Sequence, residues 1–265
     1  MKWLIAGPLA CWDVESTGIN VEQDRVVTAT VGLLQPGTPW AVDTTSWLID
    51  PGIDIPAEAT AVHGISTGQA QEFGEKPAGA LDVIAFQLAR AFLARIPVVG
   101  MNVVFDFTML DRELRRNGLP TLDERLGRPI DPVVDVLVLD KHLDPFRKGG
   151  RKLTDLCALY GVAIDGAHDS AFDALAAARV AYRIALMTRW PGDRLEAHFK
   201  ARNKPREVMQ RFLDLGQMTA ADVHDAQIGW RQVQCDGLRA HFDNKNQAHD
   251  GIPGAWPQLP WGHRA

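Results

Sequence analysis

The sequence is poor in cysteine and contains no long hydrophobic run. Its 265 residues include only 3 cysteines, Cys11, Cys157 and Cys235, which are odd in number and far apart. This pattern excludes a small disulfide-stabilised scaffold and is typical of reduced thiols, so we expect a cytoplasmic protein. No apolar segment reaches the roughly 20 residues that a membrane-spanning helix requires, so we expect no membrane partner.

The chain also lacks an excess of positive charge. Its formal net charge is −5, from 28 Lys and Arg against 33 Asp and Glu, which disfavours a protein that coats nucleic acid through a broad basic field. An enzyme whose acidic site binds metal ions before it meets phosphate is compatible with this charge. The hydrophobic fraction of 46% and the charged fraction of 23% are those of an ordinary globular protein.

Segments typical of strands and helices succeed one another through the first part of the chain. The predicted strands are 9–14, 25–34, 40–49, 98–101 and 133–139. The predicted helices are 79–95, one that contains Phe107 and Leu114, a short one over 153–160, and the Ala-rich segment 170–188. Between residue 51 and the first of these helices, prolines and glycines predict a long irregular connection. Strands first, then helices alternating with strands, predict an α/β fold with a mixed sheet flanked by helices.

The character of the sequence changes near residue 190. We predict a domain of residues 1–190 and a mainly helical C-terminal extension of residues 191–265, whose role the sequence does not reveal. Within the extension, Thr219 and Asp222 have the spacing of a capping box and predict the start of a helix. All candidate site residues precede residue 190, so we expect the extension to be unnecessary for the chemistry.

Four acidic residues lie at the boundaries of apolar segments. Asp13 and Glu15 end the first predicted strand, where alternation places both side chains on one face. Asp106 follows a buried strand, and Asp173 lies in the first turns of a helix, five residues after His168. Each motif alone has a structural explanation, such as a solvated strand end or a helix cap. Together they are explained most simply by carboxylates that converge on a pair of divalent cations.

These motifs resemble those of the DEDDh 3′-to-5′ exonucleases, the DnaQ-like family that includes the proofreading epsilon subunit of bacterial replicative polymerase. The resemblance covers roughly residues 8–188, and it is carried by Asp13-Val14-Glu15-Ser16-Thr17-Gly18, Asn102-x-x-Phe105-Asp106 and His168-x-x-x-x-Asp173. It implies a ribonuclease H-like fold, two Mg²⁺ or Mn²⁺ ions and release of nucleoside monophosphates from a 3′ end. Met101 and Ser170 depart from the commonest family pattern, but neither is a proposed ligand or base.

The resemblance also implies a role for each site residue. The catalytic set is Asp13, Glu15, Asp106, His168 and Asp173. Its four carboxylates would bind the cations, and its histidine would act as general base. The substrate-binding set is Ser16, Thr17, Val62, His63 and Asn102. A purely structural role for His63 remains an alternative.

The predicted function is a metal-dependent exonuclease on single-stranded DNA 3′ ends, acting alone or as a proofreading factor with a DNA polymerase. An RNA-trimming member of the same family is the main alternative, because few contacts sense the 2′-hydroxyl. A binding module without chemistry is disfavoured because all five catalytic positions are intact. An Asp-dependent phosphatase would not explain the second and third motifs. The basic stretch 147–152 is compatible with a solvated loop or with a phosphate track.

Overall fold

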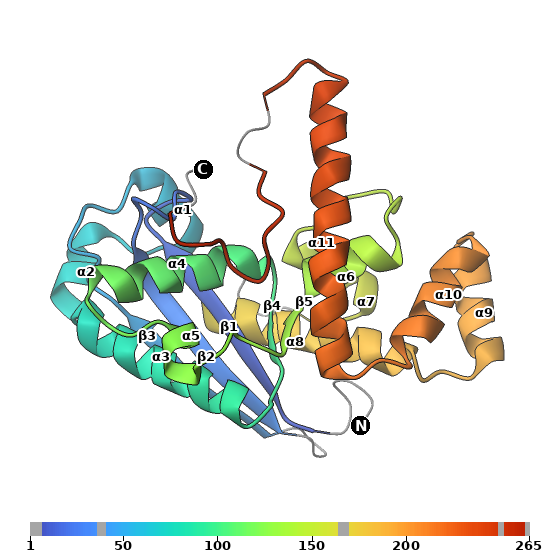
Figure 1. The fold of residues 1–265 in the computed structure, drawn as a ribbon, viewed down its shortest axis with the longest axis horizontal. Coiled ribbons are helices and arrows are strands. Elements are labelled where there is room, and N and C mark those ends of the chain that lie inside the picture. Colours follow the sequence, from blue (N-terminus) through green and yellow to red (C-terminus); the bar gives the residue numbers. More distant parts are fainter. Residues whose placement is uncertain (1–6, 36–40, 164–169, 249–251, 263–265) are drawn as a thin grey trace.

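The computed structural model describes residues 7–35, 41–163, 170–248 and 252–262, which build a mixed sheet with helices on both faces (Figure 1). The strands are β1 (Leu9–Ser16), β2 (Val26–Gln35), β3 (Ala41–Leu48), β4 (Val98–Gly100) and β5 (Val133–Asp135), in the order β3-β2-β1-β4-β5. The pairs β1–β2 and β2–β3 are antiparallel, whereas β1–β4 and β4–β5 are parallel. The predicted mixed sheet is therefore confirmed.

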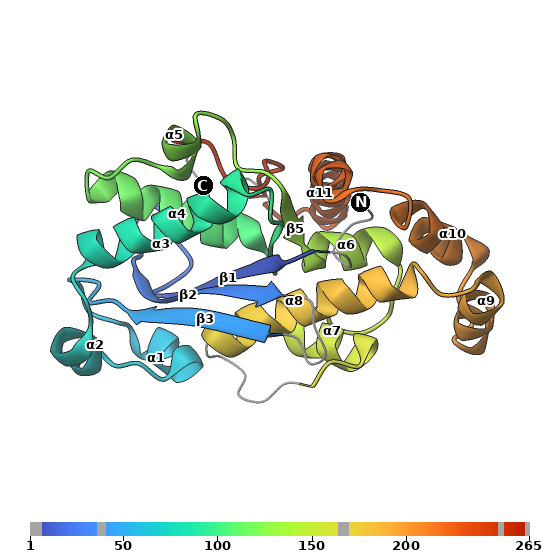
Figure 2. The same cartoon turned by 90° about the horizontal axis from the view of Figure 1, so that it is seen from below.

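The helices form two layers around this sheet (Figure 2). Their bounds are α1 (Ala57–His63), α2 (Thr67–Phe73), α3 (Pro77–Leu93), α4 (Val103–Arg116), α5 (Leu122–Leu126), α6 (Val136–Leu143), α7 (Leu153–Tyr160) and α8 (Ser170–Met187). In the C-terminal extension they are α9 (Gly192–Ala201), α10 (Arg206–Leu215) and α11 (Ala220–Asp243). Helices α3 and α4 pack on one face of the sheet, and α8 crosses the other. None of the helices within the described residues is long and apolar enough to cross a membrane.

Alternation along β1 separates the two layers. Trp12 and Val14 enter the hydrophobic cluster beneath α3 and α4, while Leu9 and Cys11 enter the cluster beneath α8. Successive side chains of a strand point to opposite faces. Asp13 and Glu15 continue the alternation of Leu9 and Cys11, so their side chains lie on the α8 side of the sheet.

Two segments differ from the sequence prediction. The expected irregular connection contains two short helices, α1 and α2, the second of which begins with a capping box at Ser66. The predicted strand 133–139 is wrong beyond residue 135, because the chain turns there into α6. The side chain of Asp135 accepts hydrogen bonds from the backbone N–H groups of Leu137 and Val138 at 2.9 and 3.4 Å, and this N-cap starts the helix within an apolar run.

The C-terminal extension packs directly against the rest of the chain. Side chains of α9, α10 and α11 belong to the same hydrophobic cluster as α8. On α11, the Gln227 side chain accepts from the Asp135 backbone N–H at 2.8 Å and donates to the Val133 carbonyl at 3.0 Å, while His224 Nδ1 accepts from the Val133 N–H at 3.1 Å. These polar side chains take the place of a further strand along β5 and satisfy its edge.

The last described segment, 252–262, returns across α4. The Arg112 guanidinium, which is fully buried, contacts the carboxylates of Asp111 and Glu22 and donates to the carbonyl oxygens of Leu259 and Pro260. A buried guanidinium has to be paired in this way, because an unpaired buried charge costs several kcal/mol. Through Arg112, the C-terminal segment is tied to the loop that follows β1.

Removal of the Gln227 amide should destabilise the whole fold. Gln227→Ala leaves a backbone N–H and a C=O of β5 buried without partners, and we expect a loss of about 2–4 kcal/mol in the free energy of unfolding. Urea denaturation measures this loss. The exposed Gln217 provides the control, since Gln217→Ala should change stability by less than about 0.5 kcal/mol. Equal effects of the two substitutions would contradict the assigned role of Gln227.

Candidate functional site

The first two carboxylates of the site come from the end of β1. Asp13 lies opposite Thr30 of β2, and Glu15 lies opposite Thr28. Both acids are half-buried, although they end a strand whose preceding four residues are buried. The register of β1 against β2 shifts between Glu15 and Ser16, and the strand ends at Ser16, one residue after the second acid.

The third carboxylate, Asp106, is buried in the first turns of α4. Burial raises its pKa well above the ordinary range, and the negative charges of Asp135 and Glu15 raise it further. The backbone amides of Val14 and of Asp106 itself oppose this effect. Asp106 Oδ2 is buried and has no hydrogen-bond partner among the described residues. This arrangement brings the second motif against the end of β1 and leaves a buried oxygen atom available to a ligand.

Asp135 supports Asp106 and was not predicted as a site residue. Its carboxylate accepts from the backbone N–H groups of Asn102 and Val103, at 3.0 and 3.1 Å, and so fixes the turn that begins α4. Asn102 adopts the left-handed conformation there, with φ of 60°, which asparagine tolerates better than most residues. An acid within an apolar run was the available signal in the sequence, since a buried carboxylate needs several donors.

The fourth carboxylate, Asp173, lies one turn into α8. The first turn of α8 is fixed by a buried hydrogen bond of 2.8 Å between Ser170 Oγ and Thr30 Oγ1. Thr30 lies opposite Asp13 in the sheet. Burial raises the pKa of Cys157 to about 11, and the negative charge of Asp173 adds to this effect. Ser170, a departure from the family pattern, therefore aligns the start of α8 with the end of β1.

The fifth predicted residue, His168, lies outside the described residues. Within the described ranges, no three Asp, Glu, His or Cys side chains form a group that could hold a metal ion by themselves. The residues nevertheless suit a hard divalent cation in two respects. The donors are carboxylate oxygens, which magnesium and manganese prefer, and Asp106 Oδ2 is a buried oxygen without a partner.

The predicted substrate-binding residues lie at three places: Ser16 and Thr17 at the end of β1, Val62 and His63 at the end of α1, and Asn102 directly before α4. Ser16 Oγ donates to the Gly18 carbonyl at 2.6 Å, and Thr17 Oγ1 donates to Asp24 at 3.0 Å, so both hydroxyls hold the loop after β1. Val62, at the end of α1, is 52% exposed. Burial lowers the pKa of His63, and a hydrogen bond with the backbone of Ser16 opposes this effect. The end of α1 therefore lies next to the end of β1.

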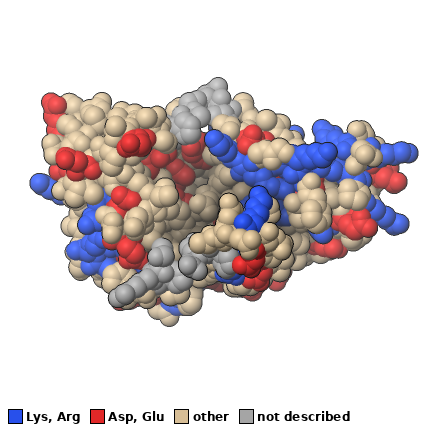
Figure 3. Space-filling view, turned by 90° about the horizontal axis from the view of Figure 1, so that it is seen from above, with Lys and Arg blue, Asp and Glu red and all other residues tan. Residues whose placement is uncertain are grey.

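A pocket of about 330 Å³ opens beside the carboxylates on the α8 side of the sheet. Its lining includes Thr28, opposite Glu15, together with His63 and Ser170. Figure 3 shows a hollow in the middle of one face of the molecule with Asp and Glu side chains beside it. A site for a small charged ligand thus has both an acidic wall and a pocket.

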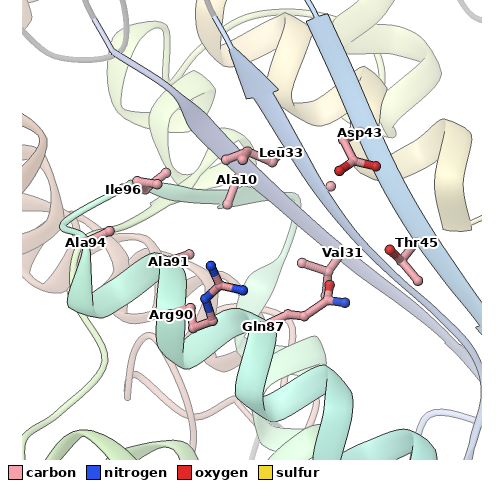
Figure 4. A pocket seen from close by; sticks show the side chains of 11 residues that line it. Ala10, Val31, Leu33, Asp43, Thr45, Gln87, Arg90, Ala91, Ala94 and Ile96 are labelled. Carbon is pink, nitrogen blue, oxygen red and sulfur yellow. The ribbon is translucent and has the colours of Figure 1, made fainter.

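A second pocket, of about 360 Å³, lies between α3 and the strands (Figure 4). Arg90 and Gln87 of α3 and Asp43 and Thr45 of β3 surround it. None of the predicted site residues lines this pocket. The candidate site is therefore the acidic end of β1 and not this pocket.

The five-stranded mixed sheet with its flanking helices is the ribonuclease H-like exonuclease fold. Residues 11–181 match the family RNase_T, described as Exonuclease, and the chain belongs to this family of DnaQ-like 3′-5′ exonucleases. No curated protein matches the chain significantly.

Solved structures of exonuclease I share the fold. One has a TM-score of 0.57 and 20% identity over 72% of this chain. The enzyme from Methylocaldum szegediense has a TM-score of 0.54 and 22% identity over 68% of this chain. E. coli exonuclease I in complex with a dT13 oligonucleotide has a TM-score of 0.54 and 18% identity over 77% of this chain. The matches cover 44%, 41% and 46% of those chains, so this chain corresponds to less than half of each.

The raised pKa of Asp106 predicts a pH-dependent stability in the absence of metal. A carboxyl whose folded-state pKa is raised stabilises the fold below its unfolded pKa, and this stability is lost as pH rises through the folded pKa. Asp106→Asn removes the buried charge, so in EDTA the variant should be more stable than the parent at pH 8. The two should converge below about pH 4, the ordinary carboxyl range.

Urea midpoints between pH 4 and pH 8 measure this difference. Asp54→Asn, at an exposed position, is the control and should follow the parent throughout. A less stable Asp106→Asn protein at pH 8 would mean that the fold does not carry an unfavourable charge there.

Proposed function

We propose that this chain is a metal-dependent 3′-to-5′ exonuclease of the DEDDh branch that releases nucleoside monophosphates from single-stranded DNA. The observation that carries the proposal is the placement of Asp106. Its Oδ2 atom has no hydrogen-bond partner in the described part of the chain, and it is buried near Glu15 of the strand that also carries Asp13. A buried carboxylate that is repelled by neighbouring carboxylates is suited to binding a divalent cation.

Each acidic residue has a role in this proposal. Asp13, Glu15, Asp106 and Asp173 would hold two Mg²⁺ or Mn²⁺ ions, which when bound supply charge neutralisation at the phosphate and activation of water. The His168 imidazole would take the proton from the attacking water, since its ordinary pKa is near neutral pH. A zinc-bound complex of E. coli exonuclease I with single-stranded DNA is among the similar structures, which supports divalent metal as the cofactor.

The pocket next to the acids would receive the terminal nucleotide. Its volume of about 330 Å³ is at the lower end of the range for small-molecule sites, which suits one nucleotide better than a duplex end. Trp47 and Ile65 offer it an apolar wall, and Thr28 offers a hydroxyl. Val62, near the end of α1, and Asn102, directly before α4, are both exposed, and we propose that they contact the same nucleotide.

Single-stranded DNA is the proposed substrate because the similar exonuclease I structures hold dT13 and dA16 oligonucleotides. Neither a DNA polymerase partner nor a cytoplasmic location is tested by the structure, and both stay predictions. The boundary at residue 190 stays a prediction as well, although the extension shares a hydrophobic cluster with α8.

Digestion of end-labelled oligonucleotides tests the proposal. With Mg²⁺ or Mn²⁺, a single-stranded DNA labelled at its 3′ end should lose the label first, as a mononucleotide, and EDTA should stop the reaction. Asp13→Asn should lower the rate about 100-fold or more, whereas Asp54→Asn should leave it unchanged. An RNA of the same sequence, digested in parallel, distinguishes the alternative substrate. Label released first from the 5′ end, or activity that survives EDTA, would contradict the proposal.

A further inference from the structure

A basic groove lies outside the candidate active site, between the segment after α6 and the turn that joins α9 to α10. Its volume is about 560 Å³, and Lys148, Arg202 and Arg211 are among its lining residues. A second groove of about 480 Å³ continues from it along α9 and α10, where Lys200 and Arg206 are added. The part of this surface that α9, α10 and the turn between them supply lies outside the family match, which ends at residue 181.

The acidic side chains near the groove are largely neutralised. Asp140 pairs with Arg147 and Arg151, and Asp144 pairs with Lys204 at 2.5 Å. Among the lining residues of the two grooves, Glu207 and Glu196 are the acids that remain.

Five cations of this surface have no carboxylate partner within 4.0 Å in the described part of the chain. They are Lys148, Lys200, Arg202, Arg206 and Arg211. The groove is therefore positive in a chain whose formal net charge is −5. Figure 3 shows the same concentration of Lys and Arg over the end of the molecule that carries α9 and α10, extending toward the central hollow.

An aromatic ring stands exposed among these cations. Phe146, between Pro145 and Arg147 in the groove wall, is 92% exposed. A phenylalanine ring this exposed contributes almost nothing to the stability of the fold, since hardly any of its apolar surface is removed from water. Aromatic rings beside positive charges are the combination by which proteins bind single-stranded nucleic acid, with bases stacked on the ring and phosphates near the cations.

The length of helix α6 separates the groove from Asp135, which fixes the turn before Asp106. Helix α6 begins directly after Asp135, and its eight residues lead to Asp144 at the groove. At 1.5 Å per residue, the helix spans about 12 Å. Adjacent phosphates of a stacked strand are about 3.4 Å apart along its axis, so this length corresponds to roughly three or four nucleotides.

We propose that this groove binds the sugar-phosphate backbone of a single strand about three or four nucleotides before the 3′ end held at the acidic site, with one base stacked on Phe146. The direction of the bound strand, with its 3′ end at the acidic site, rests on the proposed nuclease function. The proposal gives the C-terminal extension a function in substrate binding, since α9, α10 and the turn between them supply four of the five cations.

Binding measured in EDTA tests the groove without any reaction. The first variant is Lys148→Gln/Arg202→Gln/Arg211→Gln, and a 16-nucleotide single-stranded DNA is the probe. We expect the Kd to rise at least tenfold at low salt. The slope of log K against log salt concentration should become shallower by about 2, because each lost phosphate contact on a single strand contributes about 0.7.

Phe146→Ala is the second variant and tests stacking separately. It should raise the Kd roughly tenfold and leave the salt slope unchanged, since it removes no charge. The ring is almost fully exposed, so this substitution should not affect folding. A blunt duplex of the same length should bind the parent more weakly than the single strand does, because its bases are not free to stack on Phe146.

The matched control is Lys76→Gln/Arg90→Gln/Lys245→Gln, which removes the same charge at exposed positions away from the groove. It should change the Kd less than twofold. Hydrolysis of a dinucleotide, which cannot reach the groove, should be unchanged in all these variants. Equal effects of the groove and control triples, or equal binding of duplex and single strand, would overturn the groove proposal.

The two proposals fail in distinguishable ways. If the parent hydrolyses dinucleotides but groove variants bind the 16-mer normally, the nuclease function stands and the groove proposal falls. If the parent hydrolyses nothing in Mg²⁺ or Mn²⁺ while its binding still depends on the groove cations, the nuclease function falls and the groove proposal stands.

Discussion

The repulsion between carboxylates at the end of β1 is the interaction on which the rest of the site depends. Asp106 is buried next to Asp135 and within the field of Glu15, and these contacts make its ionised form unfavourable. Other hydrogen bonds hold the elements around Asp106 in place. The Asp135 carboxylate accepts from the backbone amides at the start of α4, and Ser170 fixes α8 against Thr30. A fold selected for stability alone would not keep such an arrangement, whereas a site for divalent cations needs it.

The C-terminal extension is coupled to this site through β5. Gln227 and His224 satisfy the backbone of a strand whose last residue, Asp135, supports both Asn102 and Asp106. On the other side of the site, Arg112 links the segment 252–262 to Glu22 in the loop after β1. The extension therefore stabilises the elements that present the carboxylates, even though the proposed ligands all lie outside it.

Much of the fold could be predicted from the sequence because its signals are local. Alternation placed Asp13 and Glu15 on one face of the first strand, helical spacing identified α3, and the Thr219 capping box marks the start of α11. The end of β5 could not be predicted, since the apolar run continues into α6 and the turn depends on one carboxylate.

The acids of the candidate site could be proposed from the sequence, whereas most of the residues that hold them in place could not. Asp13, Glu15, Asp106 and Asp173 stand in motifs of fixed spacing, but Thr30, Asp135 and Gln227 act through contacts between residues far apart in the chain. Such contacts leave no periodic pattern in a single sequence. Ser16 and Thr17 show the converse, because residues predicted to bind substrate also hold their own loop through their hydroxyls.

The most direct test of this account is the number of Mn²⁺ ions that the protein binds. Metal-free protein is titrated with Mn²⁺ at pH 7.5, and free ion is followed by electron paramagnetic resonance. The account predicts two ions per chain for the parent and for Asp54→Asn, and fewer for Asp106→Asn. A parent protein that binds no Mn²⁺ at millimolar concentration, or an Asp106→Asn variant that binds as the parent does, would contradict the claim that these carboxylates form a two-cation site.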